Sequence, residues 1–99
     1  MFHVYILYSA KLERYYIGST ELLPEARLEQ HNSLDLATKF TRRGQPWQLK
    51  VAINCQSRLQ ALRIERHVKR MKSRKYLEDL LRYPEMREKL IKRYEVQDS

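Results

Sequence analysis

Two tyrosines, Tyr5 and Tyr16, stand in short apolar stretches that alternate as β-strands do, over residues 3–7 and 15–18. If these stretches are the arms of a hairpin and Ile17 faces the core, both phenols emerge together on the opposite face of the sheet. Gly18 lies on that same face and would leave room there for a ligand. Two phenols beside bare backbone could form a reaction surface, although tyrosine is also a favoured strand residue and paired tyrosines commonly just pack.

Arg27 and His31 add a cation and a titratable imidazole close to these phenols. They lie one helical turn apart, in a helix predicted to begin at Pro24 directly after the second strand. The first turns of that helix can therefore sit over the end of the sheet that displays the tyrosines. Arginine holds two phosphate oxygens at once, and histidine accepts a proton near neutral pH. The group suits phosphodiester chemistry; the alternative is an ordinary solvated helix surface.

Glu65 is an acidic residue on or beside the apolar face of a later helix. It follows Ala61 and Leu62 and precedes Val68 at helical spacing. A carboxylate in that position must be paired or must bind a cation. On position alone, an ion pair with one of the many nearby arginines is the simpler interpretation.

Taken together, these segments resemble the GIY-YIG endonuclease family over roughly residues 3–75, and in particular its small stand-alone bacterial, excinuclease-C-like members. The first triplet is His3-Val4-Tyr5, which keeps only the tyrosine, and the second, Tyr16-Ile17-Gly18, is complete. The further segments that carry the resemblance are Gly18-Ser19-Thr20, Arg27-Leu28-Glu29-Gln30-His31-Asn32, Lys39-Phe40-Thr41-Arg42, and Ala61-Leu62-Arg63-Ile64-Glu65 followed by Val68-Lys69. Each segment is weak alone, but their order and spacing are specific.

The resemblance implies a phosphodiesterase that depends on Mg²⁺ or Mn²⁺, with a single metal held by Glu65. It implies that Tyr5 or Tyr16 activates the attacking water, with His31 bonded to a catalytic tyrosine, and that Arg27 steadies charge on the scissile phosphate. Because a free phenol has a pKa near 10, the tyrosine needs help from a neighbour or a metal-bound water. Tyr5 is our preferred base, and Tyr16 the positioning residue or alternate base.

The charge of the chain points to a polyanionic partner. The formal net charge is +8, and residues 51–99 carry thirteen Lys and Arg against seven Asp and Glu. DNA is the expected partner, with RNA left open and a membrane surface disfavoured. The expected nucleic-acid contacts are Gly18, Lys39, Arg42, Arg63, Lys69, Arg70 and Lys72.

Length and composition predict one domain over residues 1–99, with a core of about residues 2–75 and additional C-terminal helices at about 76–95. The sequence has no apolar run of membrane-spanning length and no signal-peptide pattern, which favours a cytoplasmic protein. Cys55 is the one cysteine, so an internal disulfide and a cysteine-rich zinc site are excluded.

Local patterns predict an α+β fold, a small three-stranded antiparallel-type sheet flanked by helices. Strands are expected at about residues 2–8, 14–19 and 47–53, and helices at 24–32, from a Ser57 cap to about Lys72, from a Ser73 cap, and from Pro84. Ser57 and Gln60 resemble a capping box. The segment Ser33 to Gln45 is predicted to be a loop.

The leading functional prediction is a metal-dependent endonuclease that hydrolyses phosphodiester bonds in DNA, in DNA repair or processing. The alternative is a nucleic-acid-binding module on the same fold with weak or no cleavage, which the absence of a separate substrate-choosing domain favours. A third possibility, a structural protein whose basic helix binds an acidic partner, explains the charge but leaves the tyrosine, arginine, histidine and glutamate constellation unexplained.

Overall fold

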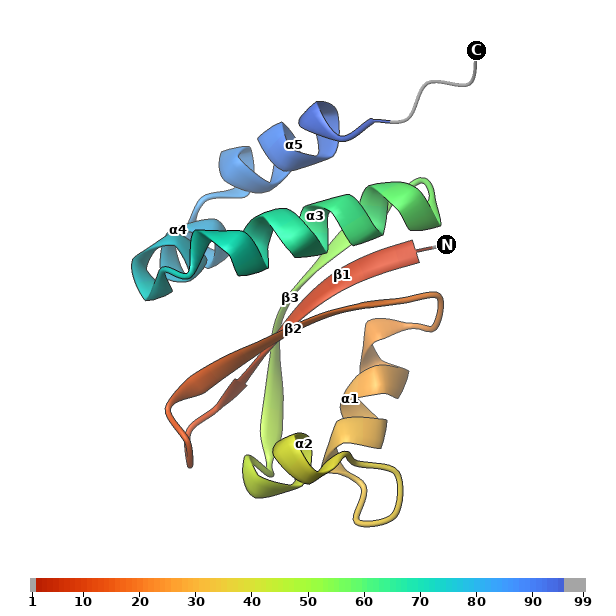
Figure 1. The fold of residues 1–99 in the computed structure, drawn as a ribbon, viewed down its shortest axis with the longest axis vertical. Coiled ribbons are helices and arrows are strands. Elements are labelled where there is room, and N and C mark those ends of the chain that lie inside the picture. Colours follow the sequence, from red (N-terminus) through yellow and green to blue (C-terminus); the bar gives the residue numbers. More distant parts are fainter. Residues whose placement is uncertain (1, 96–99) are drawn as a thin grey trace.

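A computed structural model describes residues 2–95. It contains three strands and five helices, coloured along the chain in Figure 1. Their order is β1 (Phe2–Ser9), β2 (Arg14–Thr20), α1 (Pro24–Asn32), α2 (Lys39–Arg43), β3 (Trp47–Cys55), α3 (Arg58–Met71), α4 (Arg74–Arg82) and α5 (Pro84–Arg93). Within residues 2–95, no helix combines the length and apolar character needed to cross a bilayer.

The three strands form one antiparallel sheet with β1 in the centre, in the order β2-β1-β3. Helices cover both faces of this twisted sheet: α3, α4 and α5 lie on one side, and α1 and α2 on the other (Figure 1). The α+β fold predicted from the sequence is confirmed, and each face has its own hydrophobic core. The larger core lies under α3, and the smaller one under α1.

The hairpin of β1 and β2 has the register expected from its alternation. Ile6 pairs with Ile17, Leu7 with Tyr16, and Tyr5 with Gly18. Ile6 and Ile17 therefore pack toward α3, while Tyr5 and Tyr16 share the opposite face. The sequence-based placement of the two phenols on one sheet face is confirmed.

Strand β3 contributes to both cores because it contains a β-bulge. Ile6 pairs with Val51 but Leu7 pairs with Leu49, so Lys50 is an extra residue on β3. Strict alternation would have put all the odd-numbered residues of β3 on one face. The bulge instead turns Trp47 toward the face of Tyr5 and leaves Val51 on the face of α3.

Helix α3 is amphipathic and supplies most of the cover for the larger core. Its buried side is formed by Gln60, Ala61, Ile64 and Val68. Ser57 caps its N-terminus by accepting a hydrogen bond from the Gln60 amide at 3.1 Å. The expected capping box is wrong in one detail, because the Gln60 side chain accepts from the amide of Gln56, not from that of Ser57.

The sequence predicts a loop from Ser33 to Gln45. This prediction is wrong in part, because the segment contains the short helix α2. Thr38 and Thr41 form a reciprocal capping box around its first turn. The helix is also held from outside, since the Trp47 indole donates to the Thr41 carbonyl at 2.6 Å. A helix of five residues depends on such tertiary bonds and leaves little periodic signal in the sequence.

A double-mutant cycle at Tyr5 and Gly18 tests the packing that sets this hairpin. A β-carbon at Gly18 would lie 2.6 Å from Cζ of Tyr5, so the phenol would have to move. Gly18→Ala should therefore lower the free energy of unfolding by about 1–3 kcal/mol, measured by urea denaturation. In a Tyr5→Ala background most of that cost should disappear. An equal cost in both backgrounds would show that the phenol is not what requires glycine.

Candidate active site and nucleic-acid interface

The hydroxyl of Tyr5 and Nε2 of His31 share a buried hydrogen bond of 3.0 Å. Tyr5 reaches this position from β1 and His31 from the last turn of α1. Tyr16 completes the group: its ring centroid lies 4.8 Å from that of His31 and 6.4 Å from that of Tyr5. The structure thus brings together three of the predicted catalytic residues.

Burial shifts both partners of this hydrogen bond toward their neutral forms. Desolvation raises the pKa of Tyr5 above its usual 10.0, and the charge of Glu65 adds to the effect. Desolvation also lowers the pKa of His31 below its usual 6.5, helped by the positive charge of Arg27. At neutral pH the pair therefore consists of a protonated phenol and a neutral imidazole that can accept a proton.

Arg27 is the cation of this group. It lies on α1 one turn before His31, is partly buried, and donates through Nη1 to the side chain of Gln30. Beside the phenol of Tyr5, its guanidinium counteracts part of the rise in the pKa of that residue. Most of the guanidinium donors remain for a ligand, and their planar arrangement matches two phosphate oxygens.

The space expected above Gly18 is not free. This residue was expected to leave space for a ligand and to contact nucleic acid. Gly18 is instead buried, and the space above its backbone is filled by the Tyr5 phenol. The glycine is needed because no side chain fits beneath that ring, so the expected space for a ligand is absent there. The contact of Gly18 with nucleic acid stays a prediction.

Glu65 approaches the same region from the other side of the sheet, on α3. Its Oε2 lies 2.7 Å from Nζ of Lys69, and its side chain is 16% exposed. The carboxylate is near enough to Tyr5 for its charge to act on the phenol. The ion pair foreseen as the simpler interpretation is present, but with a lysine one turn along α3.

Glu65 is the candidate ligand for a metal ion, and the side chains around it limit which ion it could bind. Within residues 2–95 no group of three or more His, Cys, Asp or Glu side chains could hold a metal. This excludes a multi-ligand zinc-type centre there but not Mg²⁺, which keeps several waters and often takes only one or two carboxylates. The partly exposed carboxylate of Glu65 supplies oxygen donors of the kind that Mg²⁺ or Mn²⁺ accepts.

Two residues that hold the site together were not assigned a role from the sequence. The Asn32 side chain accepts from the Trp47 amide and donates to the Trp47 carbonyl, which fastens the end of α1 to β3. Gln45 donates to the carbonyls of His31 and Ser33. The sequence holds one signal of the role of Asn32, which is its position directly after His31 at the end of the predicted helix.

A basic groove of about 570 Å³ borders the edge strand β2. Its walls come from the β1–β2 turn, the end of α3 and the start of α4. Four cations and one acid line it together with apolar side chains: Arg14, Lys69, Lys72, Arg74, Glu13, Tyr15, Ile17, Val68, Ser73 and Leu77. Arg74 is held in place by its 2.8 Å bond to the Glu13 carbonyl and by the rings of Tyr8 and Tyr15.

The predicted nucleic-acid contacts therefore divide into separate places. Lys69 and Lys72 line the groove, whereas Lys39 and Arg42 are exposed on α2. Arg42 also donates to the Leu34 carbonyl at 2.9 Å. Arg63 and Arg70 are exposed on α3 outside the groove lining, and the charge of Arg70 acts on His67, near α5.

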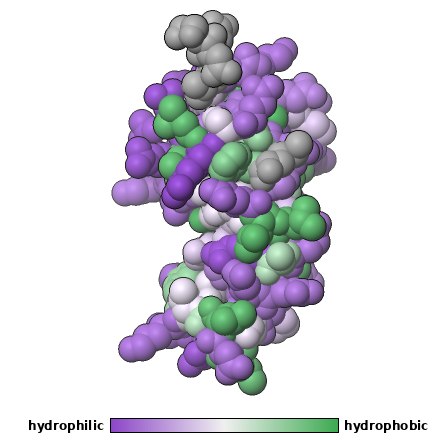
Figure 2. Space-filling model, turned by 90° about the vertical axis from the view of Figure 1, so that its right-hand side faces the viewer, coloured by the Kyte–Doolittle hydropathy of each residue, from purple (hydrophilic) through white to green (hydrophobic). Residues whose placement is uncertain are grey.

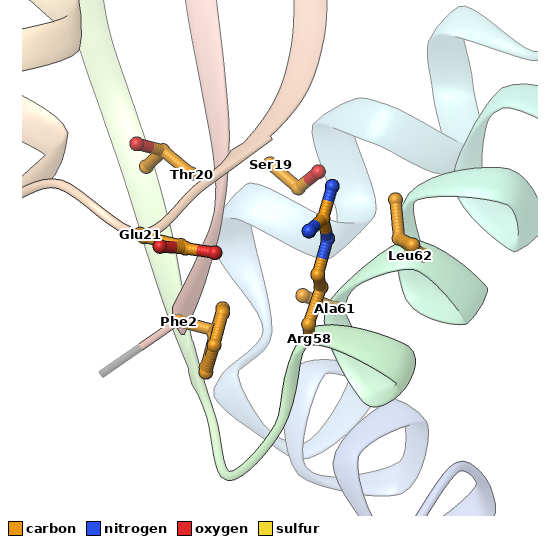
Figure 3. A pocket seen from close by; sticks show the side chains of 7 residues that line it. All are labelled: Phe2, Ser19, Thr20, Glu21, Arg58, Ala61 and Leu62. Carbon is orange, nitrogen blue, oxygen red and sulfur yellow. The ribbon is translucent and has the colours of Figure 1, made fainter.

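A smaller cavity of about 190 Å³ lies where β2 ends and α3 begins. Figure 3 shows Arg58 extending toward Ser19, with the carboxylate of Glu21 directed at the same space. Ser19 directly follows Gly18, and Leu62 is one turn before Glu65. This cavity adjoins the candidate site along both elements.

Comparison with protein families gives one finding. The profile of the GIY-YIG catalytic domain matches residues 1–77, which is most of the chain. Comparison with curated proteins and with solved structures gave no significant match. The matched range includes every candidate catalytic residue, the strands of the sheet and the helix that carries Glu65. On this match, together with the observed fold, the chain belongs to the GIY-YIG family of nucleases.

Proposed function

We propose that this protein is a metal-dependent endonuclease that hydrolyses phosphodiester bonds in DNA, as a cytoplasmic, excinuclease-C-like member of its family acting in DNA repair or processing. The observation that carries this proposal is the convergence of the Tyr5–His31 pair, Tyr16 and Arg27 on one sheet face, with Glu65 close enough to influence Tyr5. General base, phosphate clamp and metal ligand would then meet at one phosphodiester.

The protonation states of Tyr5 and His31 suggest how an attacking water loses its proton. Because the pKa of Tyr5 is raised and that of His31 is lowered, neither group is charged at neutral pH. The Tyr5 oxygen takes the proton from water while its own hydroxyl proton passes to Nε2 of His31. Arg27 binds the phosphate oxygens on which negative charge accumulates.

Glu65 is the residue that would hold Mg²⁺ or Mn²⁺. A bound cation would polarise the phosphate and stabilise the leaving oxygen. To bind a cation, the Glu65 carboxylate has to give up its ion pair with Lys69. The loss costs little free energy, because the pair is partly exposed to solvent. Lys69 lines the basic groove, so a nucleic-acid phosphate in the groove offers its ammonium another partner.

The second candidate function is nucleic-acid binding with weak or no cleavage. One observation favours it: Tyr5 is only 1% exposed, so a water reaches its hydroxyl only if neighbouring side chains move. Tyr16 is more exposed and is the alternative base. Both functions require DNA binding. They differ in cleavage, which substitutions of the candidate catalytic residues abolish only if the protein is a nuclease.

Replacing the carboxylate of Glu65 by an amide separates binding from cleavage. Glu65→Gln should bind DNA as tightly as the wild type in gel-shift or anisotropy assays, because the affinity comes from the basic surface. It should lose cleavage of single-stranded, duplex and branched DNA at all Mg²⁺ and Mn²⁺ concentrations. A matched control is Glu78→Gln on α4, which should cut normally. Wild-type cleavage by Glu65→Gln would move the metal site elsewhere.

Removing single hydroxyls tests the assignment of the tyrosines. Tyr5→Phe should lower turnover by roughly 10²-fold, the effect of losing a general base, while DNA binding stays nearly intact. Tyr16→Phe should lower turnover less if Tyr16 only positions the substrate. A large loss confined to Tyr16→Phe would make Tyr16 the base, and full activity in both variants would exclude a tyrosine base.

The basic groove should contribute sequence-independent affinity. In Arg14→Gln combined with Lys72→Gln, the slope of log affinity against log salt should fall by about 0.9 for each duplex phosphate that the protein no longer neutralises. Lys89→Gln combined with Lys92→Gln on α5 removes the same charge away from the groove and serves as the control. Equal effects of the two pairs would mean that only overall charge matters.

A further inference from the structure

Phe40 is exposed at the edge of the candidate site, although its ring lies beside two other aromatic rings. Its side chain lies on α2 and is 41% exposed. The ring centroid is 6.1 Å from that of Tyr16 and 6.1 Å from that of the buried Trp47. An aromatic ring thus stands next to a catalytic candidate with part of its surface open to solvent.

The backbone beneath Phe40 is held by bonds from three directions. Thr38 and Thr41 close the capping box of α2, and the Trp47 indole donates to the Thr41 carbonyl. The Ser9 hydroxyl donates to the Gly44 carbonyl at 2.7 Å from within the core. A ring carried on so fixed a segment loses little conformational entropy when a ligand stacks on it.

The surface around Phe40 is both apolar and basic. Leu34 is 74% and Leu36 is 68% exposed on the connection between α1 and α2. Lys39, Arg42 and Arg43 are also exposed, whereas the connection contains one acid, Asp35. Figure 2 shows hydrophobic side chains on the surface at the end of the molecule formed by α1 and α2, among hydrophilic ones.

We propose that Phe40 is a stacking platform for an unpaired nucleobase next to the phosphodiester that is cut, and that the substrate is therefore single-stranded or branched nucleic acid with unpaired nucleotides. This inference deepens the proposed function and rests on it for the position of the cut. An aromatic face gains from stacking with any base, and lysine and arginine nearby bind the flanking phosphates. Bases in an intact duplex already stack on each other and leave no face for the ring.

The test compares binding of two defined probes in EDTA, so that no cleavage occurs. The probes are a single-stranded oligonucleotide and a blunt duplex of the same length, in the same salt conditions. Phe40→Ala should weaken binding of the single strand by about five- to 150-fold, the range for losing one base–aromatic stack. Binding of the duplex should change by no more than about twofold. Leu59→Ala, an apolar residue with 44% exposure on α3, should change neither.

A second variant guards against a folding defect in Phe40→Ala. Phe40→Trp keeps an aromatic face, so it should bind the single strand at least as tightly as the wild type. Its added indole fluorescence should be quenched by the single strand but not by the duplex, after subtraction of the signal of Trp47 measured in the wild type.

Unchanged single-strand affinity in Phe40→Ala, or an equal loss on both probes, would overturn the stacking role, and the apolar surface would then fit a protein partner better. Failure here would leave cleavage and its dependence on Glu65 untouched, because these are measured separately.

Discussion

The packing of the Tyr5 phenol on the bare backbone of Gly18 is the contact on which the rest of the site depends. It requires the β1–β2 register that pairs these two residues and a glycine without steric bulk at the partner position. Only in this position does the Tyr5 hydroxyl meet Nε2 of His31. That bond joins α1, which also carries Arg27, to the sheet, together with the bonds between Asn32 and Trp47. The chain has two glycines, and the other, Gly44, makes room in the same way for Trp47.

The β-bulge at Lys50 allows a three-stranded sheet to supply two cores. Without it, Trp47 and Val51 would lie on the same face, and one core would lose a large side chain. With it, Trp47 packs among Tyr5, Leu7 and Tyr16 and also donates to α2. The bulge thus helps to position the surface that carries Phe40, because the Trp47 indole is one of the groups that hold α2. Bulges commonly re-aim side chains beside functional sites in this way.

Much of this fold could be predicted from local patterns, because strand alternation, Pro24 at a helix start and serine caps act through neighbouring residues. The placement of Tyr5 with Tyr16, and of Arg27 with His31, follows from the same short-range periods. The helix α2 was not predicted, since five residues are too few for a helical period and one of the bonds that hold it comes from Trp47, outside the helix. The space above Gly18 was also misjudged: a sequence shows that a residue lacks a side chain but not which neighbour fills the space. The sequence has many cations near Glu65, and it does not show that Lys69 is the one that pairs with it.

The helices beyond the family match hold the element that carries Glu65. The match ends at residue 77, yet Leu80 and Leu90 are buried in the same core as Ile64. Gln60 donates to the Ile91 carbonyl at 2.9 Å, and Nδ1 of His67 lies 2.8 Å from the Tyr94 hydroxyl. Helix α3 is therefore fixed between the sheet and the C-terminal helices along most of its length.

This support has a consequence for a small nuclease. Because α3 has only one face against the sheet, its outer side would otherwise be free to tilt, and the carboxylate of Glu65 would move with it. Catalytic groups need positions fixed to within about half an ångström, which packing on one side alone rarely gives. The bonds from Ile91 and Tyr94 brace α3 from the outside. The C-terminal helices thus act on Glu65 through the orientation of α3, in addition to the Arg74 and Leu77 side chains that α4 contributes to the basic groove.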